Sequence, residues 1–222
     1  GITMFGLGPK YKKAILLHGR GASGKSTALA VLQEMMPPDT TAVLPPQKWA
    51  ERFALTALVN KALNICGELP ESATIDGSRF KGVVVGEDQD TEYKGRDGFK
   101  FRPYATHWFA SNHLPRARDT SDAFIRRWLV LDFNRVIPVA ERIPNFAEQL
   151  VAEEREAIAA WAVEGFIRVE KQGWTIPSSH VAREAQIMRS NNSVAAFLQS
   201  CDRVTVDSDK IGDCRELFDV YL

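Results

Sequence analysis

One segment constrains the fold of this 222-residue chain more than any other. Residues 13–19 form a short apolar run that ends in glycine, which is typical of a buried strand. The residues that follow fit the pattern G-x-x-x-x-G-K-[ST], and residues 26–36 then have the composition of a helix that two prolines end. A strand, a glycine-rich turn and a helix in this order are the setting in which the pattern binds phosphate. The sequence therefore predicts an α/β fold built around a phosphate-binding loop.

The residue types of this loop suit a nucleotide. Gly19, Gly21 and Gly24 would let the backbone curl closely around a phosphate, with the amides at the helix start pointing toward it. Lys25 would place its ammonium near the β- and γ-phosphates, and Ser26 would offer its hydroxyl to Mg²⁺. We therefore expect ATP and Mg²⁺ as cofactors. The predicted nucleotide-binding residues are Gly19, Arg20, Gly21, Ala22, Ser23, Gly24, Lys25, Ser26 and Thr27.

The rest of the chain alternates between apolar runs and helical patterns, which predicts a mostly parallel sheet. A polar, glycine-rich stretch at residues 71–103 contains two extended pieces that could pair as a hairpin. After residue 137 the pattern is helical, so we expect an α/β core followed by a helical appendage. The expected strands are residues 13–19, 40–46, 62–66, 106–112 and 128–133, and the expected helices are 26–36, 47–61, 145–171 and 178–201.

Composition narrows the class of protein. Lys and Arg number 28, Asp and Glu also number 28, so the net charge points neither to nucleic acid nor to an anionic membrane. The three cysteines are far apart and form no C-x-x-C pair, which argues against a disulfide scaffold or a zinc ribbon. No apolar run approaches the ~20 residues of a membrane span. We expect a protein of a reducing compartment, the cytoplasm, with no membrane partner.

Hydrolysis would also need a carboxylate that holds Mg²⁺ and orients water. Glu68 follows the apolar run 62–66 and is the best candidate, although an exposed loop glutamate would give the same pattern. Asn112, at the end of another expected strand, could polarise the attacking water or could simply be a turn residue. Weaker candidates for the acid are Glu71, Asp76, Glu87 and Asp88.

Two further features are basic. Arg126 and Arg127 precede the apolar run 128–133, where one of them could reach a neighbouring subunit's γ-phosphate or both could face the end of a helix. Residues 93–127 carry eight basic residues against three acidic ones, with aromatic residues interleaved in the first half. Such a hairpin suits single-stranded nucleic acid, and a solvated β-hairpin is the plainer alternative.

Together these motifs resemble the superfamily 3 helicase domain. The motifs that carry the resemblance follow one another along the chain: residues 19–27, Glu68, residues 80–81 with 86–88, residues 110–115, and Arg126-Arg127 with residues 131–133. The chain is similar to the C-terminal helicase part of phage and plasmid primase-helicases, the poxvirus-like helicase-primase group. Gly86-Glu87-Asp88 departs from the usual Gly-Gly-Asp of that family.

The resemblance implies an AAA+-like ATPase that assembles as a homo-oligomeric ring, usually a hexamer, and moves along single-stranded DNA at a replication fork in a bacterial or phage-infected cell. Glu68 would be the Walker B acid, Asn112 the sensor, Arg127 or Arg126 the finger, and Lys94 and Arg96 the DNA contacts. Residues 1–12 would be a lead-in cut from a longer chain, 13–137 the ATPase core, 138–190 a helical segment, and 191–222 the start of a truncated winged-helix-like domain.

Two other functions fit some of these residues. A P-loop kinase would use several arginines as a lid within one chain, and the basic stretch 116–127 could serve as that lid. A DNA loader or assembly ATPase would bind and hydrolyse nucleotide without separating strands. Oligomeric state and strand separation would distinguish these functions from a helicase motor.

Overall fold

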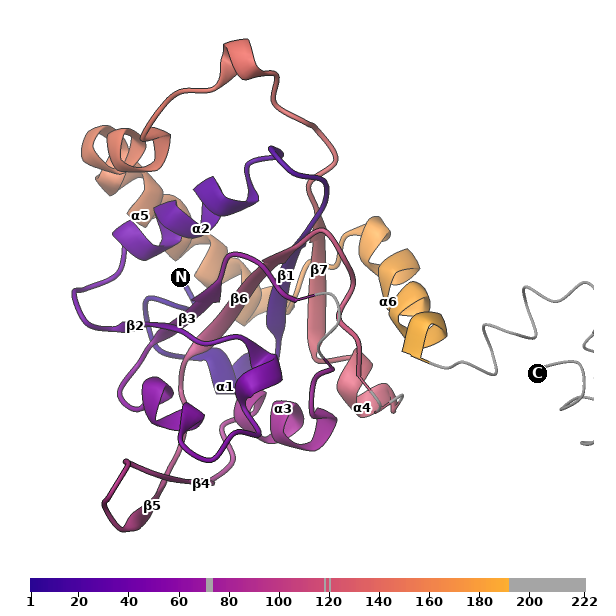
Figure 1. Ribbon diagram of the computed structural model, residues 1–222. Coiled ribbons are helices and arrows are strands. Elements are labelled where there is room, and N and C mark those ends of the chain that lie inside the picture. Colours follow the sequence, from indigo (N-terminus) through magenta and orange to yellow (C-terminus); the bar gives the residue numbers. More distant parts are fainter. Residues whose placement is uncertain (71–73, 118, 120, 192–222) are drawn as a thin grey trace, which may run out of the picture.

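The computed structural model describes residues 1–70, 74–117, 119 and 121–191. Five parallel strands form the central sheet, in the order β2-β3-β6-β1-β7 (Figure 1). The predicted α/β fold with a parallel sheet is confirmed. The strands are β1 (Ala14–His18), β2 (Thr41–Val43), β3 (Leu63–Cys66), β6 (Thr106–Ser111) and β7 (Trp128–Asp132).

The strand order decides which segments meet at the carboxyl edge of the sheet. Strand β1 lies between β6 and β7, with His18 paired to Ser111 on one side and to Asp132 on the other. Strand β6 in turn separates β1 from β3. Because all five strands run in the same direction, the segments that follow β1, β3 and β6 leave the sheet at the same edge, side by side.

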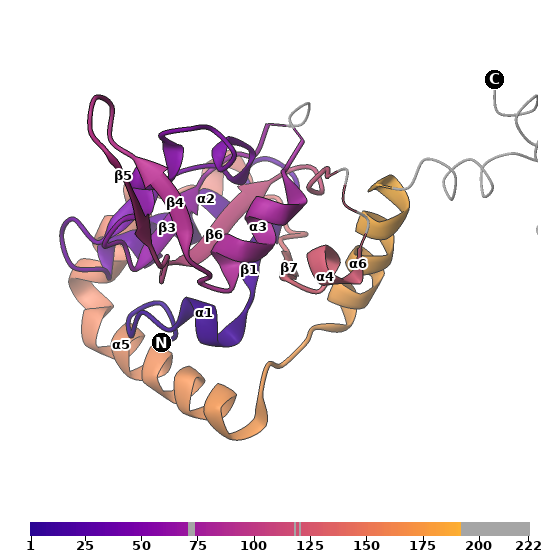
Figure 2. The ribbon, with the colours of Figure 1, turned by 90° about the horizontal axis from the view of Figure 1, so that it is seen from below.

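Helices cover both faces of the sheet (Figures 1 and 2). Helices α2 (Lys25–Glu34) and α5 (Phe146–Gln172) lie on one face and contact each other. On the other face lie α3 (Gly77–Val84), α4 (Asp122–Ile125) and the 3₁₀ turns η1 (Pro46–Lys48) and η2 (Ala54–Leu58). Helix α1 (Gly8–Tyr11) packs near β6, η3 (Val139–Glu141) follows β7, and α6 (Ser178–Asn191) lies along β7.

The core follows from the alternation of side chains along the strands. In β1, Ala14 and Leu16 face one layer, whereas Ile15 and Leu17 face the other. The first layer is dominated by five buried aromatic rings with centroid separations of 4.6–6.2 Å among contacting pairs. These rings belong to Trp49, Phe80, Phe109, Phe124 and Trp128.

One prediction about the elements between the strands is wrong, and one helix was not predicted. Residues 47–61 form two short 3₁₀ turns rather than one helix, because the buried side chains are Trp49, Leu55 and Leu58, which do not share one α-helical face. The polar stretch that begins at residue 71 contains α3, which buries Phe80 on the aromatic layer. The side chain of Asp76 caps this helix by accepting a hydrogen bond from the Arg79 amide at 2.7 Å.

The expected hairpin is present as β4 (Gln89–Glu92) and β5 (Gly98–Phe101). The helix predicted over 145–171 is α5, which ends at Gly173 with φ 75° and contains a kink at Glu154. Among the described residues, no helix is long and apolar enough to cross a bilayer. The truncated domain expected at residues 191–222 lies, beyond Asn191, outside the described residues.

Candidate nucleotide-binding site

The loop between β1 and α2 borders a cavity of about 250 Å³ at the carboxyl edge of the sheet. The predicted loop residues 21–27 lie along it, together with the residues that follow β3 and β6. The structure therefore brings Glu68 and Asn112, from two distant segments of the sequence, beside the same loop. The full lining is Gly21, Ala22, Ser23, Gly24, Lys25, Ser26, Thr27, Gly67, Glu68, Ser111 and Asn112.

Lys25 is buried at the first position of α2 and turns its ammonium toward this loop. Its Nζ donates to the carbonyl oxygens of Gly19 at 2.8 Å and Arg20 at 2.7 Å, and to Asn112 Oδ1 at 3.1 Å. Burial lowers the pKa of the Lys25 ammonium, and the nearby Glu68 carboxylate acts in the opposite direction. The charge is thus held over the cavity by neutral acceptors that a phosphate could replace.

The backbone conformation and packing of the loop explain why two of its positions are glycine. Gly24 has φ 90°, which L side chains rarely adopt. A Cβ at Gly19 would collide with the carbonyl oxygen of Phe133, the residue after β7. A Cβ at Gly21 would meet no protein atom within 4 Å, so contacts within the chain do not require glycine there, and its predicted role beside a phosphate stays a prediction. Ala22, in contrast, is held in the left-handed region at φ 58°.

Phe133 and Ile137 support the loop from the segment after β7, a contribution that sequence reasoning missed. The Phe133 amide donates to the His18 carbonyl at 2.7 Å, and the Ile137 amide donates to the Ala22 carbonyl at 2.8 Å. The strained Ala22 is therefore fixed by a hydrogen bond from outside the loop. No motif identifies such backbone contacts, because any residue other than proline can donate them.

Glu68 is exposed and lies two residues beyond β3. The Leu69 amide donates to the Ala110 carbonyl at 3.2 Å, which fastens the Glu68 turn to the end of β6. Two of the competing acids have other partners: Asp76 caps α3, and Asp88 pairs with Arg102 at 2.6 Å. Glu87 does not line the cavity, and Glu71 lies outside the described residues.

The donor set fits Mg²⁺ bound together with a nucleotide. Ser26 and Glu68 both line the cavity and come from two separate segments. The described residues contain no cluster of three or more acidic, histidine or cysteine side chains that could hold a metal alone. Mg²⁺ usually keeps several waters and takes only one or two protein oxygens beside phosphate, so two side chains suffice.

Arg126 and Arg127 do not join this cavity. They precede β7, whose first residue Trp128 pairs with Ala14 at the start of β1. The phosphate loop begins after the last residue of β1, so the length of the strand, about 13 Å, separates the two positions. Arg126 is exposed, whereas Arg127 is half-buried and its Nη1 donates to the Ala123 carbonyl within α4.

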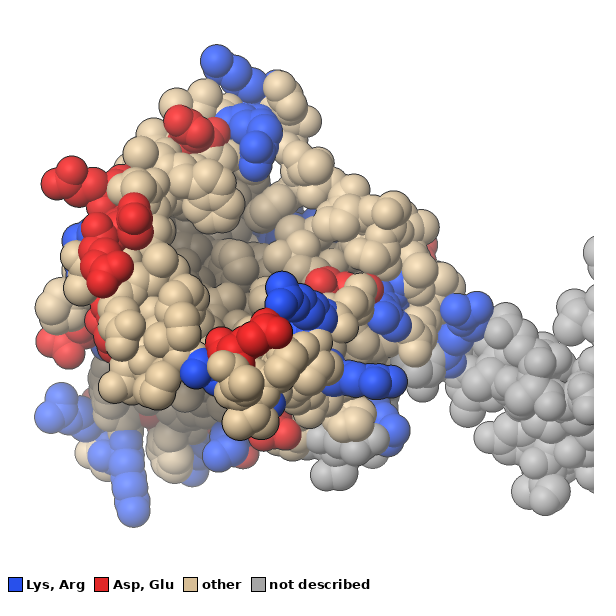
Figure 3. Space-filling view, turned by 90° about the horizontal axis from the view of Figure 1, so that it is seen from above, with Lys and Arg blue, Asp and Glu red and all other residues tan. Residues whose placement is uncertain are grey.

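A second and larger hollow of about 960 Å³ adjoins the loop on the side of α2 and α5. Ala22, Gly24 and Thr27 line both spaces. Figure 3 looks onto the hollow, whose walls in this view are mainly uncharged side chains. Apolar residues that line it include Ile137, Ile143 and Phe146.

The β4–β5 hairpin projects from the body of the molecule (Figure 2). Arg96 lies over the ring of Tyr93 at 5.9 Å, and Tyr93 stacks on Phe99 at 5.3 Å. Farther from the tip, Lys100 and Arg102 face Asp90 and Asp88. The tip, residues 93–97, carries Lys94 and Arg96 together with Asp97, so two cations outnumber one carboxylate there. Arg118, another member of the basic stretch, lies outside the described residues.

Comparison with known proteins agrees with this architecture. The fold defines an α/β protein with a five-stranded parallel sheet. The chain belongs to a family of unknown function, DUF5906, whose model matches residues 17–127, half of the chain. That range contains the phosphate loop, Glu68, Asn112 and both arginines. No curated protein matches the sequence.

Solved structures of the NrS-1 C-terminal region share the fold. The A form of its apo structure superposes with a TM-score of 0.59 at 16% identity, over 87% of this chain and 47% of that one. An apo structure of its residues 305–718 gives 0.58 at 16% identity, over 90% and 50%. The chain therefore spans about half the length of these structures. JCV helicase is more distant, with a TM-score of 0.40 at 13% identity, over 88% and 59%.

Proposed function

We propose that this chain is the ATP-hydrolysing motor core of a replicative DNA helicase from a phage or mobile element. The observation that carries the proposal is the convergence of Lys25, Glu68 and Asn112 on one cavity beside the loop. These residues follow three different strands, and the strand order brings them together. The superfamily 3 resemblance of the same motifs supports the helicase assignment.

Each group has a part in hydrolysis that suits its position. The amides of residues 21–26 would hold the phosphates, and Lys25 would exchange its carbonyl partners for the β- and γ-oxygens. Ser26 and Glu68 would hold Mg²⁺, which supplies positive charge to the phosphates when bound. The Glu68 carboxylate would orient the attacking water and accept its proton. Asn112, beside Lys25, would polarise that water or contact the γ-phosphate.

The larger hollow would receive the base and ribose. It shares Ala22, Gly24 and Thr27 with the phosphate cavity, so one bound molecule can extend from one space into the other. Ile137 and Phe146 line the hollow and offer apolar contact for a base.

The ring belongs to the same proposal. The finger would act on a neighbouring subunit, because Arg126 and Arg127 lie at the edge of the sheet opposite their own phosphate loop. Arg126 is exposed and therefore suits this role better than Arg127, which packs against α4. The same geometry argues against Arg126 and Arg127 as lid arginines of a kinase that act within one chain.

The experiment measures ATP hydrolysis, sedimentation and separation of a forked duplex, each with and without single-stranded DNA. Lys25→Ala should reduce hydrolysis to background and weaken ATP binding, because the phosphates lose the fixed cation of the loop. Lys48→Ala removes an exposed lysine of η1 and is the matched control. Normal turnover in Lys25→Ala would refute the site, and DNA-stimulated hydrolysis by a ring that separates no strands would favour a loader.

A further inference from the structure

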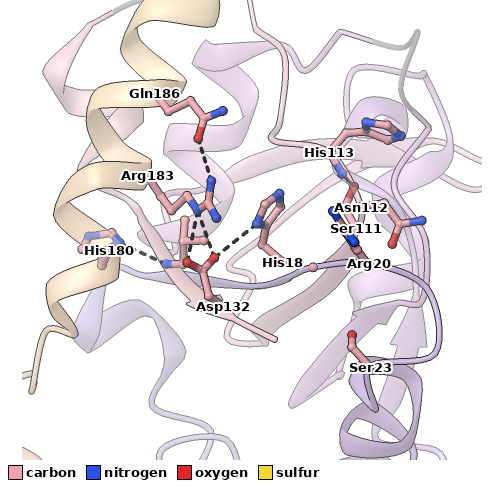
Figure 4. A network of polar contacts seen from close by, with 12 residues as sticks. His18, Arg20, Ser23, Ser111, Asn112, His113, Asp132, His180, Arg183 and Gln186 are labelled. Carbon is pink, nitrogen blue, oxygen red and sulfur yellow. Dashed lines mark hydrogen bonds and ion pairs between the residues drawn. The ribbon is translucent and has the colours of Figure 1, made fainter. Parts of the chain in front are cut away.

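A polar network connects the start of the phosphate loop to helix α6 (Figure 4). His18 is the last residue of β1, and its Nδ1 lies 3.2 Å from Asp132 Oδ1 at the end of β7. Arg183 of α6 donates from Nε to both carboxylate oxygens of Asp132, at 3.0 and 3.2 Å. The Asp132 side chain is only 8% exposed, so this contact is largely shielded from water.

Arg183 belongs to a face of α6 that packs on the molecule along the length of the helix. On this face His180 Nδ1 accepts the Val130 amide at 3.1 Å and so covers a donor on the outer edge of β7. Ile187 is fully buried in the aromatic layer. At the last turn, the Asn191 side chain accepts the Ala117 amide at 3.0 Å.

These contacts place α6 on two segments that lead to the nucleotide cavity. At one end, Asp132 holds His18, whose next residue is the first glycine of the loop. At the other end, Asn191 holds Ala117, in the segment that follows Asn112. A shift of the loop or of Asn112 would therefore disturb contacts of the same helix. Neither Arg183 nor Asp132 lines the cavity, so neither can act on a nucleotide directly.

We propose that Arg183 and Asp132 are positioning residues that fix the phosphate loop through His18, so that docking of α6 and binding of nucleotide strengthen each other. The proposal rests on nucleotide binding at the loop, as proposed above. The coupling is reciprocal: if α6 strengthens nucleotide binding, nucleotide must stabilise the docked helix to the same extent.

The test uses Arg183→Gln, which removes the charge from a partly exposed side chain and keeps much of its length. Affinity for a non-hydrolysable ATP analogue should fall about tenfold, near the lower end of typical couplings. The KM for ATP should rise with kcat nearly unchanged, because Arg183 touches no reacting group. Asp132→Asn should act in the same direction. Arg189→Gln, an exposed position of the same helix, is the matched control.

Hydrogen exchange of the α6 amides separates coupling from general damage. In the wild type the analogue should slow exchange in α6, and Arg183→Gln should abolish this protection while its melting temperature stays close to that of Arg189→Gln. Wild-type affinity in Arg183→Gln, or nucleotide protection of α6 that survives it, would overturn the inference. If the wild type itself binds no nucleotide through Lys25, the proposed function fails instead. If Asp132→Asn does not fold, Arg183→Gln decides alone.

Discussion

The two edges of the central sheet differ in what they present. At the carboxyl edge, the loop after β1 meets the turns after β3 and β6, and Lys25, Glu68 and Asn112 surround one cavity. At the amino edge, Arg126 and Arg127 lead into β7, where Lys13 Nζ also donates to the Arg126 carbonyl at 2.5 Å. One edge thus has the groups that suit binding and hydrolysis of a nucleotide, and the other has cations that a nucleotide in that cavity could not reach. This difference is what a ring of identical subunits would use.

The strongest test of this comparison changes one arginine of the amino edge at a time. Arg126→Ala should reduce hydrolysis by ~10³-fold in the assembled protein, because a finger in trans stabilises charge in the transition state. ATP affinity of a single subunit should change little. Arg127→Ala should instead cost about 1 kcal/mol of stability, because its Nη1 donates a hydrogen bond to the Ala123 carbonyl of α4. Hydrolysis rates and urea unfolding of both variants measure the difference.

Mixing experiments sharpen the same prediction. An Arg126→Ala subunit has an intact loop, and a Lys25→Ala subunit has an intact finger, so a mixed ring should regain part of the activity. No recovery in mixtures that demonstrably co-assemble would contradict action in trans. If Arg127→Ala rather than Arg126→Ala abolishes hydrolysis and is rescued by mixing, the roles of the two arginines are reversed.

The contrast between the edges was only partly predictable from sequence. The strands and the phosphate loop could be predicted, because buried strands are apolar and the loop needs glycine and lysine at fixed spacing. That Asn112 approaches Lys25 followed only from the family resemblance, and the residue pattern left it open because it depends on β6 lying next to β1. Strand order is set by packing of whole layers, which no local pattern records.

Helix α3 shows a second reason for failure. Its sequence is rich in polar residues and glycine, yet it forms because Asp76 caps it and Phe80 and Val83 are buried against the aromatic layer. The Asp76 cap was the available signal. The prediction of a helix over residues 47–61 failed in the opposite way. Apolar residues recur there at helical spacing, but the tertiary packing of Trp49 and Leu55 favours two 3₁₀ turns instead.

A second prediction tests the carboxyl edge alone. Glu68→Gln should slow hydrolysis by ~10²-fold or more, because the amide keeps the shape of the side chain and cannot accept the proton of water. ATP binding should be retained. Asp88→Asn removes an acid that pairs with Arg102 at the hairpin and should hydrolyse ATP normally. The opposite result for the two variants, from steady-state rates and nucleotide titration, would assign the catalytic acid elsewhere.

Between the two edges, the buried ring of His107 makes the fold sensitive to acid. Burial lowers its pKa to about 3, well below the 6.5 of an unfolded chain. Below pH 6.5 the unfolded chain therefore binds an extra proton, and the free energy of unfolding should fall by about 1.4 kcal/mol per pH unit until pH 3. Well above pH 6.5 His107 is neutral in both the folded and the unfolded chain, so this loss of stability is absent. Burial also lowers the pKa of His18 and His180, which act in the same direction.

Urea unfolding at pH 6.5 and pH 5 checks this prediction. The expected decrease from His107 alone is about 2 kcal/mol over that interval. His107→Gln, if it folds, should remove most of it, and an unchanged slope in that variant would show that His107 titrates normally. Activities of the two edges should accordingly be compared above pH 6.5.

The smallest effect is expected at the β4–β5 hairpin, which belongs to neither edge. Replacing both Lys94 and Arg96 by alanine should weaken single-stranded DNA binding about tenfold at ~0.15 M salt. The slope of log affinity against log salt concentration should become shallower by ~0.7 for each phosphate contact that is lost. Hydrolysis without DNA should be unchanged, because neither residue lines the cavity.

The matched control, Lys100→Ala with Arg102→Ala, removes the same charge from the same hairpin, but there each cation already faces an aspartate. A larger decrease of affinity in the control than in the tip variant would move the DNA-binding surface from the tip to the strands. Equal decreases would mean that DNA responds to the total charge of the hairpin, and the stacking of Arg96 on Tyr93 would then have no part in binding.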